Sequence, residues 1–240
     1  MNEQLTKEDL QSISSLINKP LDEISLEDEL QCLSEVYSER LFYARGGFKK
    51  IERARDNATG RMVALATPLQ TDNHCQRELF LREARILASL QHPNIVPLYA
   101  IGFIDQSVPC FSMKLIEGED FDVFMEHHDK YRNLEVFLKI CDAVAYAHSK
   151  GIIHRDIKPQ NIRVSSYGEV LLCDWGLACV ELGMCNDEAL NSIATDSFAM
   201  DNMTLRGTVK GTPGYIAPEQ IKEGKSTHLS DIYALGAVLF

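Results

Sequence analysis

The chain has 240 residues, of which 45% are hydrophobic and 25% are charged, which suits a globular protein with a sizeable core. Its formal net charge of −11 makes nucleic acid a poor partner, because binding to nucleic acid usually needs a basic surface. The seven cysteines include no C-x-x-C pair, which argues against a zinc site and favours reduced thiols in a cytoplasmic protein. The start of the chain lacks the pattern of a signal peptide, and no apolar run is long enough to form a membrane segment.

Residues 1–36 form an acidic stretch in which apolar residues recur at helical spacing. The two apolar stripes are Leu10, Ile13, Leu16 and Ile17, then Leu26, Leu30 and Leu33. Pro20 separates the stripes, so two short helices are predicted. We expect this segment to be a solvated helical extension that docks by one face.

Residues 37–117 change to a pattern of short strands around a single helix. Strands are predicted at 41–43, 51–54, 62–66, 95–101 and 108–115, and the helix is predicted at 76–90. The Asn-Ala-Thr-Gly sequence at 57–60 is typical of a hairpin turn. Strands, one helix and further strands predict a small α+β lobe.

Residues 118–240 have a more helical pattern. A long helix is predicted at 133–150, short strands and loops at 154–174, and an irregular polar segment at 177–210. An apolar helix begins at Ser230, and the sequence ends inside it. We expect a second, helical lobe that is truncated within its central helix.

Three motifs in this second region carry the clearest chemical signal. They are His-Arg-Asp-Ile-Lys-Pro-Gln-Asn at 154–161, Asp-Trp-Gly at 174–176 and Gly-Thr-Pro-Gly-Tyr-Ile-Ala-Pro-Glu at 211–219. In this order they resemble the catalytic loop, the metal-binding segment and the Ala-Pro-Glu segment of protein kinases. The resemblance runs from about residue 37 to residue 240, and it is closer to bacterial than to metazoan members of the eukaryotic-type serine/threonine kinases. It implies a two-lobed, protein-kinase-like fold of the α+β class.

The resemblance also implies a reaction, in which the γ-phosphoryl group of ATP passes to Ser or Thr hydroxyls of a protein substrate. Asp156 would orient the substrate hydroxyl or accept its proton, and Lys158 would reach the transferring phosphate. A lysine at that place is the serine/threonine pattern. Asn161 and Asp174 would hold Mg²⁺ through oxygen atoms, which a hard cation prefers.

One residue of active kinases is missing from its usual place. The third strand of these enzymes reads Val-Ala-x-Lys, whereas this chain has Val-Ala-Leu-Ala at 63–66, with Ala66 in the lysine position. The glycine-rich loop before it offers Lys49 instead. Because side chains on a strand alternate between its two faces, Lys49 shares the nucleotide side with Ile51, whereas Lys50 points away.

This arrangement resembles the with-no-lysine (WNK) kinases, which carry their catalytic lysine on the second strand. The hypothesis is that Lys49 binds the α- and β-phosphates and pairs with Glu83 of the helix predicted at 76–90. The alternative is that Lys49 is a solvated surface lysine of an inactive kinase.

The resemblance places a further set of residues around the nucleotide. They are Gly46, Gly47, Lys49, Ile51, Ala64, Met113, Ile116, Asp120 and Asn161. Within this set Met113 is the gatekeeper, Ile116 belongs to the hinge, and Asp120 is a candidate ribose contact. Arg163 stands where kinases usually place Leu or Met beneath the adenine, and it would either stack there or swing out and leave a weaker floor.

Supporting residues follow from the same resemblance. Thr212 would brace the catalytic Asp and Lys, and Asp231 would anchor the backbone of the catalytic loop. Thr204 and Thr208 are candidate phosphorylation sites whose phosphate Arg155 would bind, and an unmodified loop is the alternative.

Two other functions stay open on the sequence alone. A pseudokinase would bind nucleotide, or none, and act as a scaffold through its surfaces. An inactive fragment is the third reading, because Glu219 normally pairs with a later arginine and no arginine follows it in this chain.

Overall fold

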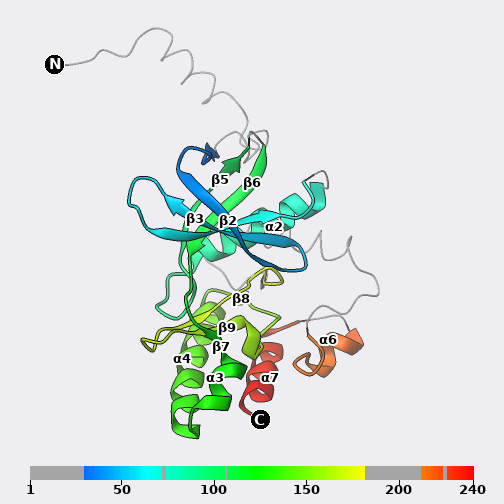
Figure 1. The fold of residues 1–240 in the computed structure, drawn as a ribbon. Helices are drawn as coiled ribbons and strands as arrows, with labels where there is room; N and C mark the ends of the chain where they lie inside the picture. Colours follow the sequence, from blue (N-terminus) through cyan, green and yellow to red (C-terminus); the bar gives the residue numbers. More distant parts are fainter. Residues whose placement is uncertain (1–29, 72–73, 106, 182–211, 224–225) are drawn as a thin grey trace, which may run out of the picture.

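The computed structural model describes residues 30–71, 74–105, 107–181, 212–223 and 226–240 (Figure 1). These residues form a small lobe built on one sheet, and a large lobe of helices and short strands that lies below it in Figure 1. The two-lobed α+β architecture expected from the sequence is confirmed. Within the described ranges, no helix combines the length and the apolar character that crossing a membrane would require.

The small lobe is a six-stranded sheet with the strand order β1-β5-β6-β4-β3-β2. Its strands are β1 (Gln31–Cys32), β2 (Tyr37–Arg45), β3 (Lys49–Asp56), β4 (Met62–Pro68), β5 (Leu98–Ile104) and β6 (Val108–Lys114). The helix predicted between them is α2 (His74–Ser89), which packs against β4, β5 and β6. The strand predicted at 95–101 begins later than expected, at the start of β5.

Strand β4 lies inside the sheet because its side chains are small or apolar. Residues 63–66 are each at most 4% exposed. Ala66 lies opposite Ile51 of β3 on one side and opposite Phe111 of β6 on the other. Ala66 cannot supply the positive charge that a lysine at this position supplies in protein kinases. The neighbouring strand β3, in contrast, begins with a lysine, Lys49.

The second helix expected in the N-terminal segment is wrong over its described part. Gln31–Cys32 form β1, which pairs in parallel with β5 at Gly102. A Cβ atom on Gly102 would lie 2.7 Å from Leu33 Cγ, so the missing side chain allows β1 to approach β5. Leu33 is buried in a cluster with Tyr37, which means that the apolar residues of the predicted stripe anchor an additional strand. Residues 1–29, which include the first predicted helix, lie outside the described residues.

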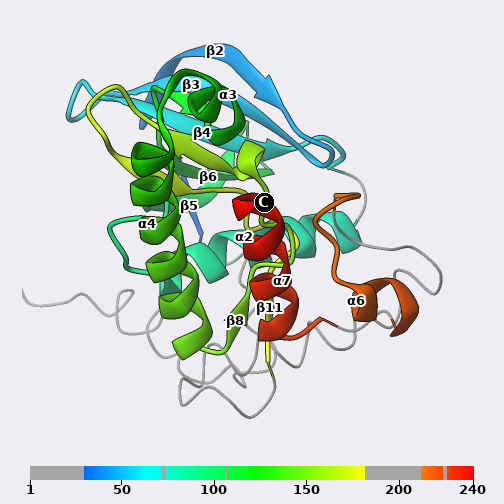
Figure 2. The ribbon, with the colours of Figure 1, turned by 90° about the horizontal axis from the view of Figure 1, so that it is seen from below.

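The large lobe consists of short ladders and four helices among its described residues. Its elements are β7 (Glu119–Asp120), α3 (Phe121–His127), α4 (Lys130–Ser149), β8 (Ile152–Ile153), η3 (Pro159–Asn161), β9 (Ile162–Val164), β10 (Val170–Leu172), β11 (Cys179–Val180), α6 (Pro218–Glu223) and α7 (His228–Leu239). Helix α4 begins earlier than predicted because Asp129 caps it, accepting hydrogen bonds from Tyr131 N at 2.9 Å and Arg132 N at 3.0 Å. Seen from below, α4 and α7 lie side by side (Figure 2).

The segment predicted to be irregular from residue 177 is partly ordered into a strand. Its described part contains β11, which pairs antiparallel with β8. This small ladder sits directly before the catalytic loop and fixes where that loop begins.

The two lobes are joined by main-chain hydrogen bonds between the loop after α2 and β10. Leu172 N donates to Asn94 O at 2.8 Å, and Val96 N donates to Leu172 O at 3.3 Å. The side chain of Asn94 adds a bond from its Nδ2 to Val170 O at 2.8 Å. The loop after α2 is therefore bound to β10, and one hydrophobic core runs through both lobes.

Candidate active site

The catalytic loop lies between β8 and η3 and is held from beneath by one buried carboxylate. Asp231 of α7 accepts hydrogen bonds from His154 N at 2.8 Å and from Arg155 N at 2.9 Å. His148 of α4 lies 2.8 Å from the same carboxylate. Because Asp231 is only 1% exposed, these bonds form in a dry environment that strengthens them, and the anchor expected at this position is present.

The carboxylate of Asp156 is surrounded by three hydrogen-bond donors. Lys158 Nζ lies 2.8 Å from Asp156 Oδ2, and Thr212 Oγ1 donates to Asp156 Oδ1 at 2.8 Å. Lys158 Nζ also donates to Thr212 Oγ1 at 2.6 Å, so the three side chains form a closed ring. Asn161 Nδ2 adds bonds to Asp156 O at 2.7 Å and Oδ2 at 3.0 Å. The predicted catalytic residues are thus held together in one orientation.

Asn161 and Asp174 offer the oxygen atoms that a hard cation prefers. The amide nitrogen of Asn161 is used by its bonds to Asp156, which leaves the amide oxygen for a metal. Asp174 has a φ of +60°, a left-handed conformation that aspartate tolerates better than most residues. Burial, the largest single influence, would raise the pKa of Asp174, but the charge and hydrogen bond of Lys49 together with smaller contributions from His154 and Lys158 outweigh it. The pKa is therefore lowered, and the carboxylate is ionised at neutral pH. This donor set fits Mg²⁺.

Lys49, the first residue of β3, reaches into the space between the lobes. Its Nζ atom forms an ion pair with Glu83 of α2 and lies 2.8 Å from Asp174 Oδ1. The pairing with Glu83 that the resemblance to the with-no-lysine kinases suggested is present. Lys50 faces the other way, and its Nζ lies 3.1 Å from Glu52 Oε1.

The ion pair between Lys49 and Glu83 is largely buried, with 14% and 6% of the two side chains exposed. Burial alone would lower the pKa of Lys49, but the carboxylates of Glu83 and Asp174 raise it above its ordinary value. Burial raises the pKa of Glu83, and the ammonium of Lys49 offsets only part of this effect. The ammonium is therefore fully charged at neutral pH, and Glu83 depends on it to remain ionised.

Comparison with known proteins agrees with this geometry. Residues 43–240 match the family model described as the protein kinase domain. The chain belongs to the protein kinase family. It is 37% identical over 217 residues to the serine/threonine-protein kinase PknD of Chlamydia muridarum (strain MoPn / Nigg) and to that of Chlamydia trachomatis serovar D, and 35% identical over 213 residues to that of Chlamydia abortus. These alignments cover 82% of this chain and 23% of each relative, so the chain spans about a quarter of the length of the curated relatives it matches.

Residues predicted to surround the nucleotide in this kinase lie along the inner side of the small lobe. Ile51, Met113 and Ile116 are partly buried and pack against the main core cluster, and Ala64 is buried in β4. The glycine-rich loop is a tight hairpin between β2 and β3. Gly46 N donates to Lys49 O at 2.9 Å, and Gly47 is exposed at its tip.

Of the two orientations considered for Arg163, the structure has the one that swings away from the adenine floor. Its guanidinium forms an ion pair with Asp120 and donates a hydrogen bond to Gly118 O. The antiparallel pairing of β7 with β9 places Asp120 directly opposite Arg163. The candidate ribose contact is therefore already bound on one side by an arginine.

Trp175, which replaces the phenylalanine common in kinases, is fully buried beside the catalytic loop. Its ring centroid lies 4.6 Å from that of His154, and the two rings meet edge to face. His154 Nδ1 in turn accepts a hydrogen bond from Asp156 N at 3.2 Å. Burial lowers the pKa of His154, so this packing keeps the imidazole neutral.

Two contacts of the site escaped sequence reasoning. One is the bond between Lys49 and Asp174, which strand alternation alone does not reveal. The other concerns Glu219, whose Oε1 accepts a hydrogen bond from Ser230 Oγ at 2.9 Å in place of the expected arginine. The capping box formed by Thr227 and Ser230 at the start of α7 was the available sequence signal. Thr204 and Thr208 lie outside the described residues.

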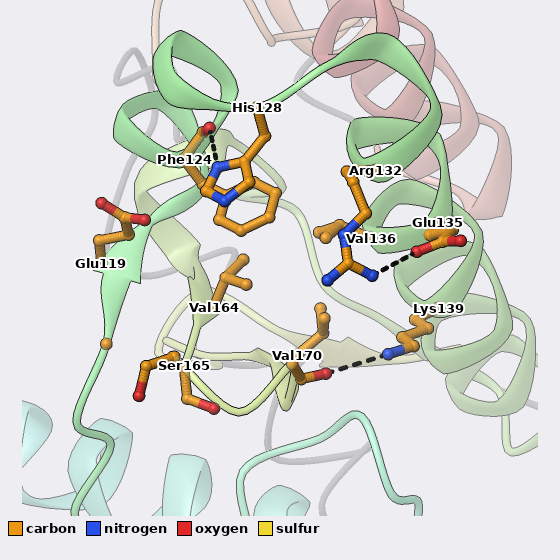
Figure 3. Close-up of a pocket in the computed structure, with 13 residues that line it drawn as sticks. Glu119, Phe124, His128, Arg132, Glu135, Val136, Lys139, Val164, Ser165 and Val170 are labelled. Atoms are coloured by element: carbon orange, nitrogen blue, oxygen red, sulfur yellow. Dashed lines mark hydrogen bonds and ion pairs between the residues drawn. The ribbon is translucent and has the colours of Figure 1, made fainter.

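A hollow of about 440 Å³ lies in the large lobe, away from the predicted site residues (Figure 3). It is bounded by α3 and α4 on one side and by β7, β9 and the turn before β10 on the other. Its lining residues are Gly118, Glu119, Phe124, His128, Arg132, Glu135, Val136, Lys139, Val164, Ser165, Ser166, Gly168 and Val170. Gly118, which accepts the hydrogen bond of Arg163, also lines this hollow.

Proposed function

We propose that this chain is an active protein kinase domain that transfers the γ-phosphoryl group of ATP to Ser and Thr hydroxyls of a protein substrate in the cytoplasm. The observation that carries the proposal is the closed ring of hydrogen bonds between Asp156, Lys158 and Thr212. A loop of merely structural polar residues has no need to hold a carboxylate and an ammonium side by side at 2.8 Å. Phosphoryl transfer does need both, because it depends on positioning and on neutralising charge.

Asp156 orients the substrate hydroxyl and accepts its proton as the hydroxyl oxygen bonds to the γ-phosphorus, while the bond from that phosphorus to the bridging oxygen breaks and ADP leaves. Its carboxylate is fixed by Lys158, Thr212 and Asn161, so no reorganisation is needed during the reaction. Lys158 lies next to the accepting carboxylate and supplies positive charge to the phosphoryl group in transit. Mg²⁺, when bound by Asn161 and Asp174, neutralises the phosphate oxygens.

Lys49 performs the task that a third-strand lysine performs in other kinases. The support for this role is its contact with Glu83 and Asp174, which places its ammonium between α2 and the metal-binding segment. We propose that the α- and β-phosphates of ATP bind at this ammonium. Glu83 would then orient Lys49 from behind.

The preference for Ser and Thr rests on two observations. Lys158 and Thr212 form the hydrogen-bonded pair described above, and both residues belong to the serine/threonine pattern. The relatives that cover this chain are named serine/threonine-protein kinases. A protein substrate is part of the same proposal.

The test measures phosphate transfer from γ-labelled ATP with Mg²⁺ to a mixed protein substrate, followed by phosphoamino-acid analysis. Wild type should label Ser and Thr, and Asp156→Asn should lose at least about a hundredfold in kcat while still binding ATP, because removing a catalytic base costs two to four orders of magnitude. Folded wild-type protein that binds ATP but transfers nothing would favour a pseudokinase scaffold. Labelling confined to tyrosine would contradict the proposed specificity.

A further inference from the structure

The short ladder between β7 and β9 has two faces with different surroundings. Its register pairs Glu119 with Val164 and Asp120 with Arg163. Glu119 and Val164 line the hollow of Figure 3. Because neighbouring side chains of a strand point to opposite faces, Asp120 and Arg163 lie on the face of the ladder that points away from that hollow.

The guanidinium of Arg163 binds a carboxylate and a main-chain carbonyl just after the hinge. One nitrogen, Nη1, binds Asp120 Oδ1, and the other, Nη2, donates to Gly118 O. Gly118 lies close to β9, since a Cβ atom there would lie 2.8 Å from Val164 C. Of the two carboxylate oxygens of Asp120, Oδ2 has no hydrogen-bond partner among the described residues, and it stays available to a ligand.

The geometry points to Arg163 as a positioning residue for ribose recognition in the ATP site: it binds one oxygen of Asp120, so that the other accepts hydrogen bonds from the ribose hydroxyls. This inference rests on the proposed function, since it concerns the nucleotide of the same reaction. The planar fork of an arginine fixes a carboxylate in one orientation, which Leu or Met at this position cannot do. Its charge also offsets that of Asp120, which would otherwise repel the triphosphate.

Direct binding of ATP and of 2′,3′-dideoxy-ATP to the full chain separates ribose recognition from every other contact. Arg163→Met removes the guanidinium and also places an apolar side chain beneath the adenine. Since both nucleotides carry the same adenine, that second effect changes their Kd values equally. The ratio of the two Kd values therefore reports only on the contacts of the ribose hydroxyls. Asp120→Ala is a clean partner variant, because Asp120 makes no side-chain capping bond to α3. Lys139→Met is the matched control, since Lys139 lies in the hollow on the other face and binds Gly168 O at 3.0 Å.

Wild type should bind ATP about tenfold more tightly than the dideoxy nucleotide, the worth of one hydrogen bond to a charged group. The ratio should fall to about one in Arg163→Met, in Asp120→Ala and in the double variant, with Arg163→Lys in between, as expected for residues that act through one contact. Lys139→Met should keep the wild-type ratio.

Three outcomes would overturn the inference. They are an unchanged ratio in Arg163→Met, a ratio near one in wild type, and additive losses in the double variant. Thermal melting of each variant shows whether it is folded before its ratio is interpreted. A folded wild type that binds neither nucleotide would instead overturn the proposed function, which distinguishes the two failures.

Discussion

The Nζ atom of Lys49 lies 2.8 Å from Oδ1 of Asp174, which joins the first residue of β3 in the small lobe to the Asp-Trp-Gly segment of the large lobe. The same ammonium pairs with Glu83 of α2. Three elements that are far apart in the sequence therefore meet at one positive charge. Because β4 carries Ala66 and no lysine, Lys49 has no competitor from that strand for the carboxylates of Glu83 and Asp174.

Replacing Lys49 should remove phosphate transfer, whereas replacing its neighbour should not. Lys49→Met is expected to lower kcat/KM at least about a hundredfold, because it deletes a charge-assisted contact to phosphate and leaves Glu83 buried and unpaired. Lys50→Met is the matched control and should retain activity, since Lys50 contacts Glu52 on the other face of β3. Labelled-ATP assays on both variants decide the matter, and full activity in Lys49→Met would contradict the relocated lysine.

Removing the hydroxyl of Thr212 should slow the reaction without weakening ATP binding. Thr212→Val deletes one bond to Asp156 Oδ1 and one from Lys158 Nζ, and a hydrogen bond to a charged group contributes about 1.5–3 kcal/mol. We expect kcat to fall by about 10- to 100-fold, with the Kd for ATP unchanged. Thr212→Ser keeps the hydroxyl and should restore most of the rate. Equal kcat values in the valine and serine variants would show that the ring is not used in catalysis.

A methyl group on Gly102 should detach β1 from the sheet. The new Cβ would meet the backbone of Gln31 and lie 2.7 Å from Leu33 Cγ, and overpacking of this kind costs about 1–3 kcal/mol of the free energy of unfolding. Gly236→Ala in α7 is the contrasting variant, because among the described residues nothing outside the backbone of α7 itself and the adjacent residues lies within 4 Å of its Cβ position, and alanine favours a helix by up to about 1 kcal/mol. Urea unfolding of both variants measures the difference. Equal stability of Gly102→Ala and wild type would mean that β1 does not depend on the close approach.

Three of the described thiols should react with iodoacetamide in a fixed order at pH 8. Cys32 is exposed, and hydrogen bonding with Ser34 lowers its pKa. Burial raises the pKa of Cys110 and of Cys173 to about 12. Mass spectrometry of briefly treated protein should find Cys32 alkylated first and the other two protected, and Ser34→Ala should slow the reaction at Cys32. Early modification of Cys173 would indicate that the segment from Cys173 to Trp175 separates from His154 in solution.

Stability should fall as the pH drops below about 6.5, partly because of His154. Burial lowers the pKa of this imidazole from 6.5 in the unfolded chain. Between the two pKa values the unfolded chain binds more protons than the folded one, so the free energy of unfolding decreases as the pH falls through this window. The contribution of His154 to stability is fully present above the window. His154→Asn keeps an acceptor for Asp156 N but cannot be protonated. Melting temperatures between pH 5 and 8 should therefore vary less in this variant, and an identical pH dependence would exclude His154 as a source.

Much of the site could be predicted because its residues lie in local motifs with fixed spacing. The residues from Asp156 to Asn161 share one loop, and strand alternation was enough to predict that Lys49 and Lys50 point to opposite faces of β3. The sequence could not decide whether Arg163 stacks beneath the adenine or swings out, because its orientation depends on Gly118 and Asp120, which reach it across the ladder between β7 and β9. The strand β1 was mistaken for a helix, because its two residues are too few for a pattern and their position depends on the missing side chain of Gly102. The domain boundaries at residues 37 and 118 stay predictions.

The position of Lys49 has a mechanical consequence. A lysine on β4 would be fixed in the middle of the sheet and independent of the loop that covers the nucleotide. Lys49 instead begins β3 immediately after that loop, and its own carbonyl accepts the bond from Gly46 that closes the hairpin. If Lys49 binds the phosphates as proposed, the glycine-rich loop and the ammonium that holds the nucleotide belong to one continuous hairpin, so lifting the loop to release ADP would also withdraw that charge.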